Sequence, residues 1–198
     1  MASNGGTHTA WEDVALIREI PGAVICDPAD DVQMEWIIKE FSKMEGIHYV
    51  RSNRKAVRNV YKKGSSFKIG QGNILKEGKD ILIIAAGQLV SEALDCAEEL
   101  EKEGHSVEVI DMFTIKPLDE KLLIKEAKGK SKIVTIENHS IYGGLGSAVS
   151  EVIAENGIPV PVKRIGVKEK FGQVGTAEFL QKEFGLTAKQ IKETICQF

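Results

Sequence analysis

The sequence lacks several features that would assign it to a specialised class of protein. Its 198 residues include three cysteines, Cys26, Cys96 and Cys196. An odd and widely spaced set argues against a disulfide framework and against a zinc site. The longest apolar run, 81–86, is far shorter than the roughly 18 to 20 residues that span a bilayer. No basic segment followed by an apolar stretch marks a targeting signal, so we expect a cytoplasmic protein with no membrane association.

An excess of charge of one sign is also lacking. Lysine and arginine total 26 residues and aspartate and glutamate 29, which gives a formal charge of −3. The basic residues are scattered and form no stripe, so we expect no nucleic acid partner. The hydrophobic content of 42% and the charged content of 28% are ordinary for a soluble globular protein and sufficient for one core.

Strands and helices alternate through most of the chain. Short apolar runs are separated by segments in which apolar residues recur at helical spacing. The strands predicted in the second part are 81–86, 107–110, 133–136 and 162–165. Two more helices are predicted near 177–184 and 188–195. This alternation predicts an α/β fold with a mainly parallel sheet and helices on both faces.

The first part of the chain shows the same alternation but is too small to be a domain. Thr9 and Glu12 have the spacing of a capping box, which predicts a helix start. The strands predicted here, 23–26 and 47–51, are too few for a doubly wound core. We therefore expect three parts, which are an incomplete α/β domain at 1–64, a hairpin-like linker at 65–78 and a second domain at 79–198.

Two polar segments lie where a ligand site is expected. His8 follows two glycines and precedes a predicted helix, so it either faces a ligand or is a surface-loop histidine. Arg51 and Arg54 follow a predicted strand end, where parallel sheets bind ligands. Arginine in that place either binds phosphate or carboxylate with its planar fork or forms an ordinary ion pair.

A third polar segment, Glu137–His139, follows another predicted strand and leads to the glycine-rich stretch Gly143–Gly146. This stretch precedes a helix, so it is either an anion-binding nest or a tight contact between loop and helix. The dinucleotide fingerprint fails, since Val149 stands at the third glycine position. We favour the packing interpretation.

Several of these motifs together resemble a known family. Gly5-Gly6-Thr7-His8, Glu12-Asp13-Val14-Ala15 and Pro28-Ala29-Asp30 resemble the second half of the pyrimidine-binding domain of transketolases, and the fit continues through 49–54. The runs 113–119 and 137–149 resemble the transketolase C-terminal domain, which implies a three-layer fold for residues 79–198. The chain looks closest to the C-terminal subunit of split transketolases, in which another polypeptide carries the diphosphate domain.

The resemblance implies roles for three residues in substrate binding. His8 matches the histidine that contacts hydroxyls of the sugar substrate, and Arg54 matches the arginine that binds its phosphate. Asn4 stands where many members have an acid that contacts a substrate hydroxyl. An amide at that position offers one carbonyl acceptor and no charge.

The resemblance also implies what this sequence does not supply. Family members carry a glutamate, earlier in the pyrimidine-binding domain, that activates thiamine diphosphate, and no residue here matches it. The Gly-Asp-Gly pattern that holds Mg²⁺ and the diphosphate is absent too. We therefore expect no catalytic, cofactor-binding or metal-binding residue in this chain, and no activity without the missing regions.

The complete enzyme implied by the resemblance transfers a two-carbon ketol unit between sugar phosphates in the pentose phosphate pathway, with thiamine diphosphate and Mg²⁺ as cofactors. The expected partners are a diphosphate-binding subunit or N-terminal section and a second copy of this chain. Two alternatives remain open. In the first, the chain is a non-catalytic assembly or regulatory module. In the second, it is a piece of a related thiamine enzyme such as deoxyxylulose-phosphate synthase or a 2-oxo acid dehydrogenase β subunit.

Overall fold

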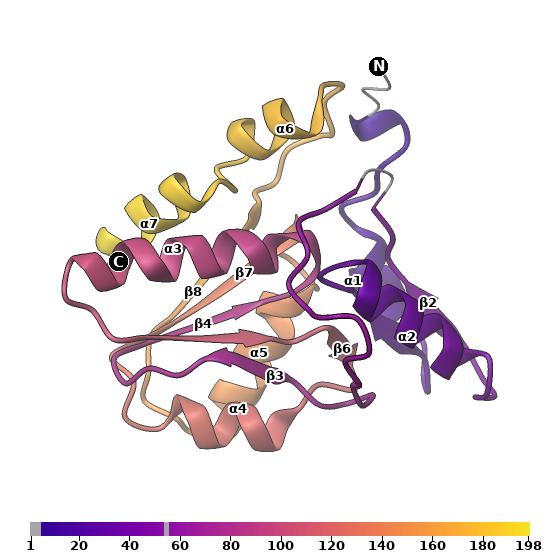
Figure 1. Cartoon of the computed structure of the whole chain (residues 1–198), viewed down its shortest axis with the longest axis horizontal. Helices are drawn as coiled ribbons and strands as arrows, with labels where there is room; N and C mark the ends of the chain where they lie inside the picture. The colour runs from indigo at the N-terminus through magenta and orange to yellow at the C-terminus, as the bar shows by residue number, and fades with distance from the viewer. Residues whose placement is uncertain (1–4, 54–55) are drawn as a thin grey trace.

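A five-stranded sheet is the centre of the computed structural model, which describes residues 5–53 and 56–198 (Figure 1). The strand order is β3-β5-β4-β7-β8, with β3 antiparallel to β5 and the other strands parallel. Its strands are β3 (Asn73–Lys76), β4 (Ile81–Ala85), β5 (Val107–Asp111), β7 (Lys132–Ser140) and β8 (Val162–Val167). The predicted linker 65–78 therefore contains β3, which pairs with β5 and forms no hairpin of its own. Pairing of this kind protects the edge of β5.

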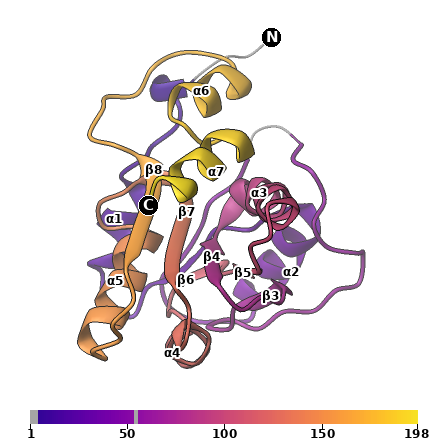
Figure 2. The same ribbon diagram turned by 90° about the vertical axis from the view of Figure 1, so that its left-hand side faces the viewer.

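Helices cover both faces of this sheet, as Figures 1 and 2 show. They are α3 (Val90–Lys102), α4 (Glu120–Ala127), α5 (Leu145–Glu155) and α7 (Ala188–Cys196). Alternate side chains of β4 point to opposite faces. Ile81 and Ile83 join the core cluster that includes α3 and α7, whereas Leu82 and Ile84 join the cluster that includes α4 and α5. The predicted three-layer α/β fold is confirmed.

The N-terminal part of the chain forms a second, smaller sheet with the order β2-β1-β6. Its elements are η1 (Gly5–Thr7), α1 (Asp13–Arg18), β1 (Val24–Cys26), α2 (Asp31–Phe41) and β2 (His48–Val50). The third strand, β6 (Thr114–Lys116), comes from the second part of the chain and is antiparallel to β1. The two strands predicted in the first part therefore gain a neighbour from the second part.

Shared packing and one lysine hold the two parts together. Val14 of α1 and Ile25 of β1 belong to the same core cluster as the residues of α4 and α5. The Nζ of Lys116 donates to the backbone oxygens of Arg18, at 2.6 Å, and Ile20, at 2.7 Å. These carbonyls lie at the C-terminal end of α1, where the last turn has no intrahelical donors. Lys116 therefore caps the C-terminal end of α1 and links it to β6.

The predicted helix start at Thr9 is wrong. Helix α1 begins at Asp13, and its N-cap residue Glu12 makes no side-chain capping bond. The Oε2 of Glu12 instead accepts a hydrogen bond from the backbone nitrogen of Trp11, at 3.1 Å. The backbone nitrogen of Thr9 donates to the oxygen of Gly5, at 2.9 Å. Residues 5–9 thus form a turn of their own, which separates Thr9 from the helix.

The chain returns to its N-terminal segment before its last two helices. The loop before α6 (Ala177–Glu183) passes η1, where the backbone nitrogen of Gly6 donates to the oxygen of Gln173, at 2.8 Å. Figure 1 shows α6 beside the N-terminal segment, at the same end of the molecule. Within the described ranges, no helix combines the length and the apolar character needed to cross a membrane.

Candidate functional site

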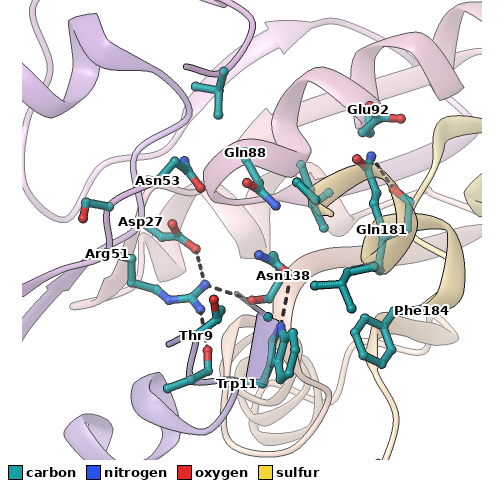
Figure 3. Close-up of a pocket in the computed structure, with 18 of the residues that line it drawn as sticks. Thr9, Trp11, Asp27, Arg51, Asn53, Gln88, Glu92, Asn138, Gln181 and Phe184 are labelled. Carbon is teal, nitrogen blue, oxygen red and sulfur yellow. Dashed lines mark hydrogen bonds and ion pairs between the residues drawn. The ribbon is translucent and has the colours of Figure 1, made fainter. Parts of the chain in front are cut away.

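A cavity of about 670 Å³ lies where the N-terminal part meets the five-stranded domain (Figure 3). Its walls come from the segment 5–13, the segment that follows β2, the 3-10 helix η2 (Gly87–Leu89) with the first turn of α3, and the region of α6. Asn138, in the last part of β7, also lines it. The cavity is therefore at the carboxyl ends of parallel strands, where α/β sheets bind ligands.

The structure brings one predicted site residue, His8, to this cavity. His8 is exposed, and its Nδ1 lies 2.8 Å from the Oγ1 of Thr7. Asn4 and Arg54 lie outside the described residues, so their predicted roles stay predictions. Ser52 and Asn53, which precede Arg54, line the cavity. The segment 5–13 and residues 52–53 therefore line the same cavity.

Arg51 lines the cavity and is the centre of a largely buried group of ion pairs. Its Nε donates to the Oδ2 of Asp13, at 2.8 Å, and its Nη1 donates to the Oδ2 of Asp27, at 3.0 Å. Nη1 also donates to the backbone oxygen of Asn138, at 3.0 Å. Burial lowers the pKa of Arg51, but Asp27 and Asp13 outweigh it, so the pKa is raised and the guanidinium stays charged. For Arg51, the ion-pair interpretation is confirmed.

The second arginine in the described lining, Arg58, is also paired. Its Nη1 donates to the Oδ2 of Asp95, at 2.7 Å, and its Nη2 donates to the Oδ1 of the same residue, at 2.9 Å. On the neighbouring wall, the Oε2 of Glu92 accepts a hydrogen bond from the backbone nitrogen of Ala188, at 2.7 Å. Both arginines of the described lining are therefore paired with carboxylates of the protein.

The glycine-rich loop before α5 binds a carboxylate of the protein itself. The Oε2 of Glu137 accepts from the backbone nitrogen of Leu145, at 2.7 Å, and its Oε1 accepts from that of Gly146, at 2.8 Å. A Cβ at Gly144 would lie 2.0 Å from the Oε2 of Glu137. Glycine is therefore needed for this close approach, and the amides at the start of α5 are occupied. The predicted packing interpretation is confirmed.

A buried acid that the sequence analysis did not identify lies at the end of β5. Asp111 is 0% exposed, and its Oδ2 accepts from the hydroxyl of Tyr61, at 2.6 Å, and from the Nε2 of Gln33, at 2.7 Å. The pKa of Asp111 is raised from 3.8 to about 7, mainly by burial and also by the nearby Asp27 and Asp30, although the hydrogen bonds from Tyr61 and Gln33 lower it. Its position directly after a buried strand was the signal in the sequence.

Replacing Asp111 with asparagine is expected to flatten the dependence of stability on pH. Between 3.8 and about 7 the folded protein holds a proton on this group that the unfolded chain has lost. The stabilisation is therefore present at low pH and lost as the pH rises through 7, with a slope of up to ~1.4 kcal/mol per pH unit. Urea denaturation between pH 5 and pH 8 measures this slope.

Two other buried groups also have shifted pKa values. The slope of stability against pH must therefore be compared between the variant and the parent. Burial raises the pKa of Glu137 to about 7, which adds a slope of the same sign. Burial lowers the pKa of His139, which gives a slope of the opposite sign. Both remain in the Asp111→Asn variant and cancel in the difference. Identical slopes for the parent and the variant would contradict the assignment to Asp111.

Comparison with known proteins then decides the family. Residues 70–191 match the family model described as "Transketolase, C-terminal domain". The chain belongs to the transketolase C-terminal domain family. The match covers all of the five-stranded sheet and its four covering helices except the end of α7.

Relatives of the chain include components of split transketolases. The 6-deoxy-6-sulfo-D-fructose transketolase subunit SqwH of a Clostridium species is 41% identical over 95% of this chain and 58% of its own length. A putative transketolase C-terminal section of Methanocaldococcus jannaschii is 40% identical over 100% of this chain and 62% of its own length. The chain therefore spans about three-fifths of these curated relatives.

The fold of this transketolase C-terminal domain protein is also seen in a solved structure. A split-gene transketolase, described as an inactive beta4 tetramer, superimposes with a TM-score of 0.89 and 40% identity. The superposition covers 97% of this chain and 62% of that chain. The likeness therefore extends to the N-terminal part as well as to the five-stranded domain.

The described residues do not fit the diphosphate end of thiamine diphosphate, the cofactor that transketolases generally use. A diphosphate with Mg²⁺ needs oxygen ligands for the metal and free donors for the phosphates. In the described ranges, no three His, Cys, Asp or Glu side chains converge as metal ligands. Both arginines of the described lining are paired, and Glu137 occupies the amides at the start of α5. The described residues therefore leave the diphosphate and its metal to be held by other protein groups.

Proposed function

We propose that this chain is the C-terminal part of a thiamine-diphosphate-dependent transketolase that transfers a two-carbon ketol unit between sugar phosphates. The observation that carries the proposal is the position of His8. In a chain of this family, it lies in a cavity of about 670 Å³ together with the segment that leads to Arg54. The cavity is large enough for a sugar phosphate, since small-molecule pockets commonly measure about 300–1,000 Å³.

Each residue of the proposed substrate site has a distinct task. His8 donates a hydrogen bond to a hydroxyl of the sugar, as an exposed imidazole at the cavity rim can. Arg54 binds the phosphate and Asn4 accepts from a hydroxyl. Arg51, whose charge is already balanced by Asp13 and Asp27, holds the cavity lining in place and does not bind phosphate.

The proposal includes a partner and an arrangement of domains. A subunit with the diphosphate domain supplies the cofactor-binding residues, and two copies of this chain associate in the complete cytoplasmic enzyme. Residues 1–64 belong to the pyrimidine-binding domain and 79–198 to the C-terminal domain, joined by 65–78. The likeness to proteins named as transketolase subunits and sections supports a divided enzyme.

Reconstitution tests the proposal. The chain is co-expressed with a diphosphate-domain subunit from the same genome, and the purified complex is supplied with thiamine diphosphate, Mg²⁺ and a panel of ketose and aldose phosphates. We expect ketol transfer by the complex and none by either subunit alone, because the described residues of this chain do not fit the diphosphate end of the cofactor.

Other outcomes would replace the proposal. Ketol transfer by the purified chain without a partner would refute the dependence on a second subunit. Formation of deoxyxylulose phosphate in place of ketol transfer would identify a related thiamine enzyme. A chain that neither binds the subunit in a pull-down nor restores activity would favour a non-catalytic assembly module.

A further inference from the structure

Two carboxamides of the C-terminal domain project into the cavity and have no part in the proposed role of His8. Gln88 belongs to η2, directly after β4, and Asn138 lies near the end of β7. Strands β4 and β7 are neighbours in the sheet, so the two residues emerge side by side at its carboxyl edge. Figure 3 shows the ends of their side chains facing one another across the cavity.

Most of the hydrogen-bond donors and acceptors of these two carboxamides have no partner among the described residues. The Oδ1 of Asn138 accepts from the Nε1 of Trp11, at 3.3 Å, which fixes the plane of the amide and leaves its Nδ2 protons facing the cavity. The Gln88 side chain makes no hydrogen bond to any described residue, although it is half-buried. A half-buried polar group without a protein partner is satisfied by water or by a ligand.

Apolar side chains form part of the wall around these amides. Trp11 is 4% exposed and packs edge-on against Phe184, with ring centroids 5.1 Å apart. Trp11, Leu180 and Phe184 all line the cavity. The arginines of the described lining are bound to Asp13, Asp27 and Asp95, so they offer little net charge to an anion.

This combination points to one kind of ligand. A carboxamide both donates and accepts hydrogen bonds, as a hydroxyl does, whereas an anion requires donors alone. Apolar walls with a few convergent polar groups are typical of small-molecule pockets. The neutral amides therefore suit several hydroxyls on one carbon chain better than they suit a phosphate.

We infer that Gln88 and Asn138 form a neutral, hydroxyl-binding subsite that determines which polyhydroxylated carbon chain the cavity accepts. The subsite belongs to the C-terminal domain, whereas His8 belongs to the segment 5–13, whose Trp11 contacts Asn138. The inference rests on the proposed function in taking the cavity as the sugar site, but it can be tested on this chain alone.

Ligand-observed NMR on the full chain tests the subsite. D-arabitol, an uncharged five-carbon polyol, is the probe, and 1,5-pentanediol, with the same carbon chain but fewer hydroxyls, is the ligand control. We expect saturation transfer from the protein to D-arabitol and at least about fivefold less to the diol, because each lost hydrogen bond weakens binding by about 1 kcal/mol.

Three variants assign the binding to residues. Gln88→Leu removes the first carboxamide, and Asn138→Asp keeps the acceptor for Trp11 while removing the two donors. We expect each to reduce saturation transfer to D-arabitol about fivefold or more. Gln71→Leu, at an exposed glutamine outside the cavity lining, is the matched control and should leave it unchanged.

The outcomes separate this inference from the proposed function. No transfer to D-arabitol, or equal transfer in all variants, would overturn the subsite even if the reconstituted complex transferred ketol units. Binding that depends on Gln88 and Asn138 would support the subsite even if the complex had no such activity. Circular dichroism of each variant shows whether a loss of signal comes from unfolding.

Discussion

The Arg51→Met variant is expected to lose about 3–5 kcal/mol of free energy of unfolding. The side chains of Arg51, Asp13 and Asp27 are 12%, 11% and 8% exposed. Methionine fills a similar volume but leaves two carboxylates buried near each other without a cation. The loss is large because the variant loses the attraction between Arg51 and the two carboxylates. The cost of burying these carboxylates is then no longer offset by a cation.

The effect should extend beyond the ion pair, because Arg51 joins three separate segments. Asp13 begins α1, Asp27 follows β1 and the backbone oxygen of Asn138 belongs to β7. Arg51→Lys keeps the charge but loses the planar fork, so it should fall between the parent and Arg51→Met. Urea denaturation monitored by circular dichroism measures all three proteins.

Arg58→Met is the matched control for this prediction. Arg58 also lines the cavity and also binds a carboxylate, but Arg58 and Asp95 are 53% and 41% exposed. Solvent screens such a pair, so its removal should change the free energy of unfolding by about 0–1 kcal/mol. Equal losses in Arg51→Met and Arg58→Met would show that burial of the first pair does not matter.

The sequence predicted the four parallel strands of the five-stranded sheet well because their signals are local, whereas β3 was predicted to be part of a linker. Each strand of the parallel sheet is a short apolar run, and each helix that follows repeats its apolar residues at helical spacing. Strand β6 was missed because its three residues, Thr114–Lys116, carry no such pattern. Its partner β1 lies far earlier in the chain, and pairing at that separation depends on the tertiary fold.

The candidate site was predictable where one segment carries the signal and not where several segments meet. Two glycines before His8 marked it as a loop residue that could approach a ligand, and the structure places it at the cavity. The pairing of Arg51 with Asp13 and Asp27 depends on the docking of α1 beside β1, which no local pattern contains.

Gln88 shows a different limit. It follows the buried strand β4 at a glycine, which is the same strand-end position that drew attention to Arg51. The rule that ligands sit outside the carboxyl ends of parallel strands therefore applied to it equally. The neutral side chain of Gln88 was not predicted as a site residue from the sequence. An amide indicates a ligand site only when the structure shows that its donors and acceptors have no protein partner.

The His8→Ala variant is expected to lower kcat/KM for ketol transfer by the reconstituted enzyme about 10- to 100-fold. A hydrogen bond between an imidazole and a substrate hydroxyl contributes about 1.5–3 kcal/mol when one partner is charged or becomes so in the transition state. The expected change is in activity and not in folding, since His8 is exposed and its imidazole contacts the adjacent Thr7.

His105→Ala is the control for this experiment. His105 is also exposed, but it follows α3 and lies outside the cavity lining, so its removal should leave kcat/KM unchanged. Steady-state kinetics with a ketose phosphate donor, together with urea denaturation of both variants, separates the two effects. If His8→Ala matched the parent in kcat/KM, the imidazole would be a surface-loop residue, and the substrate would have to be held by other groups of the cavity.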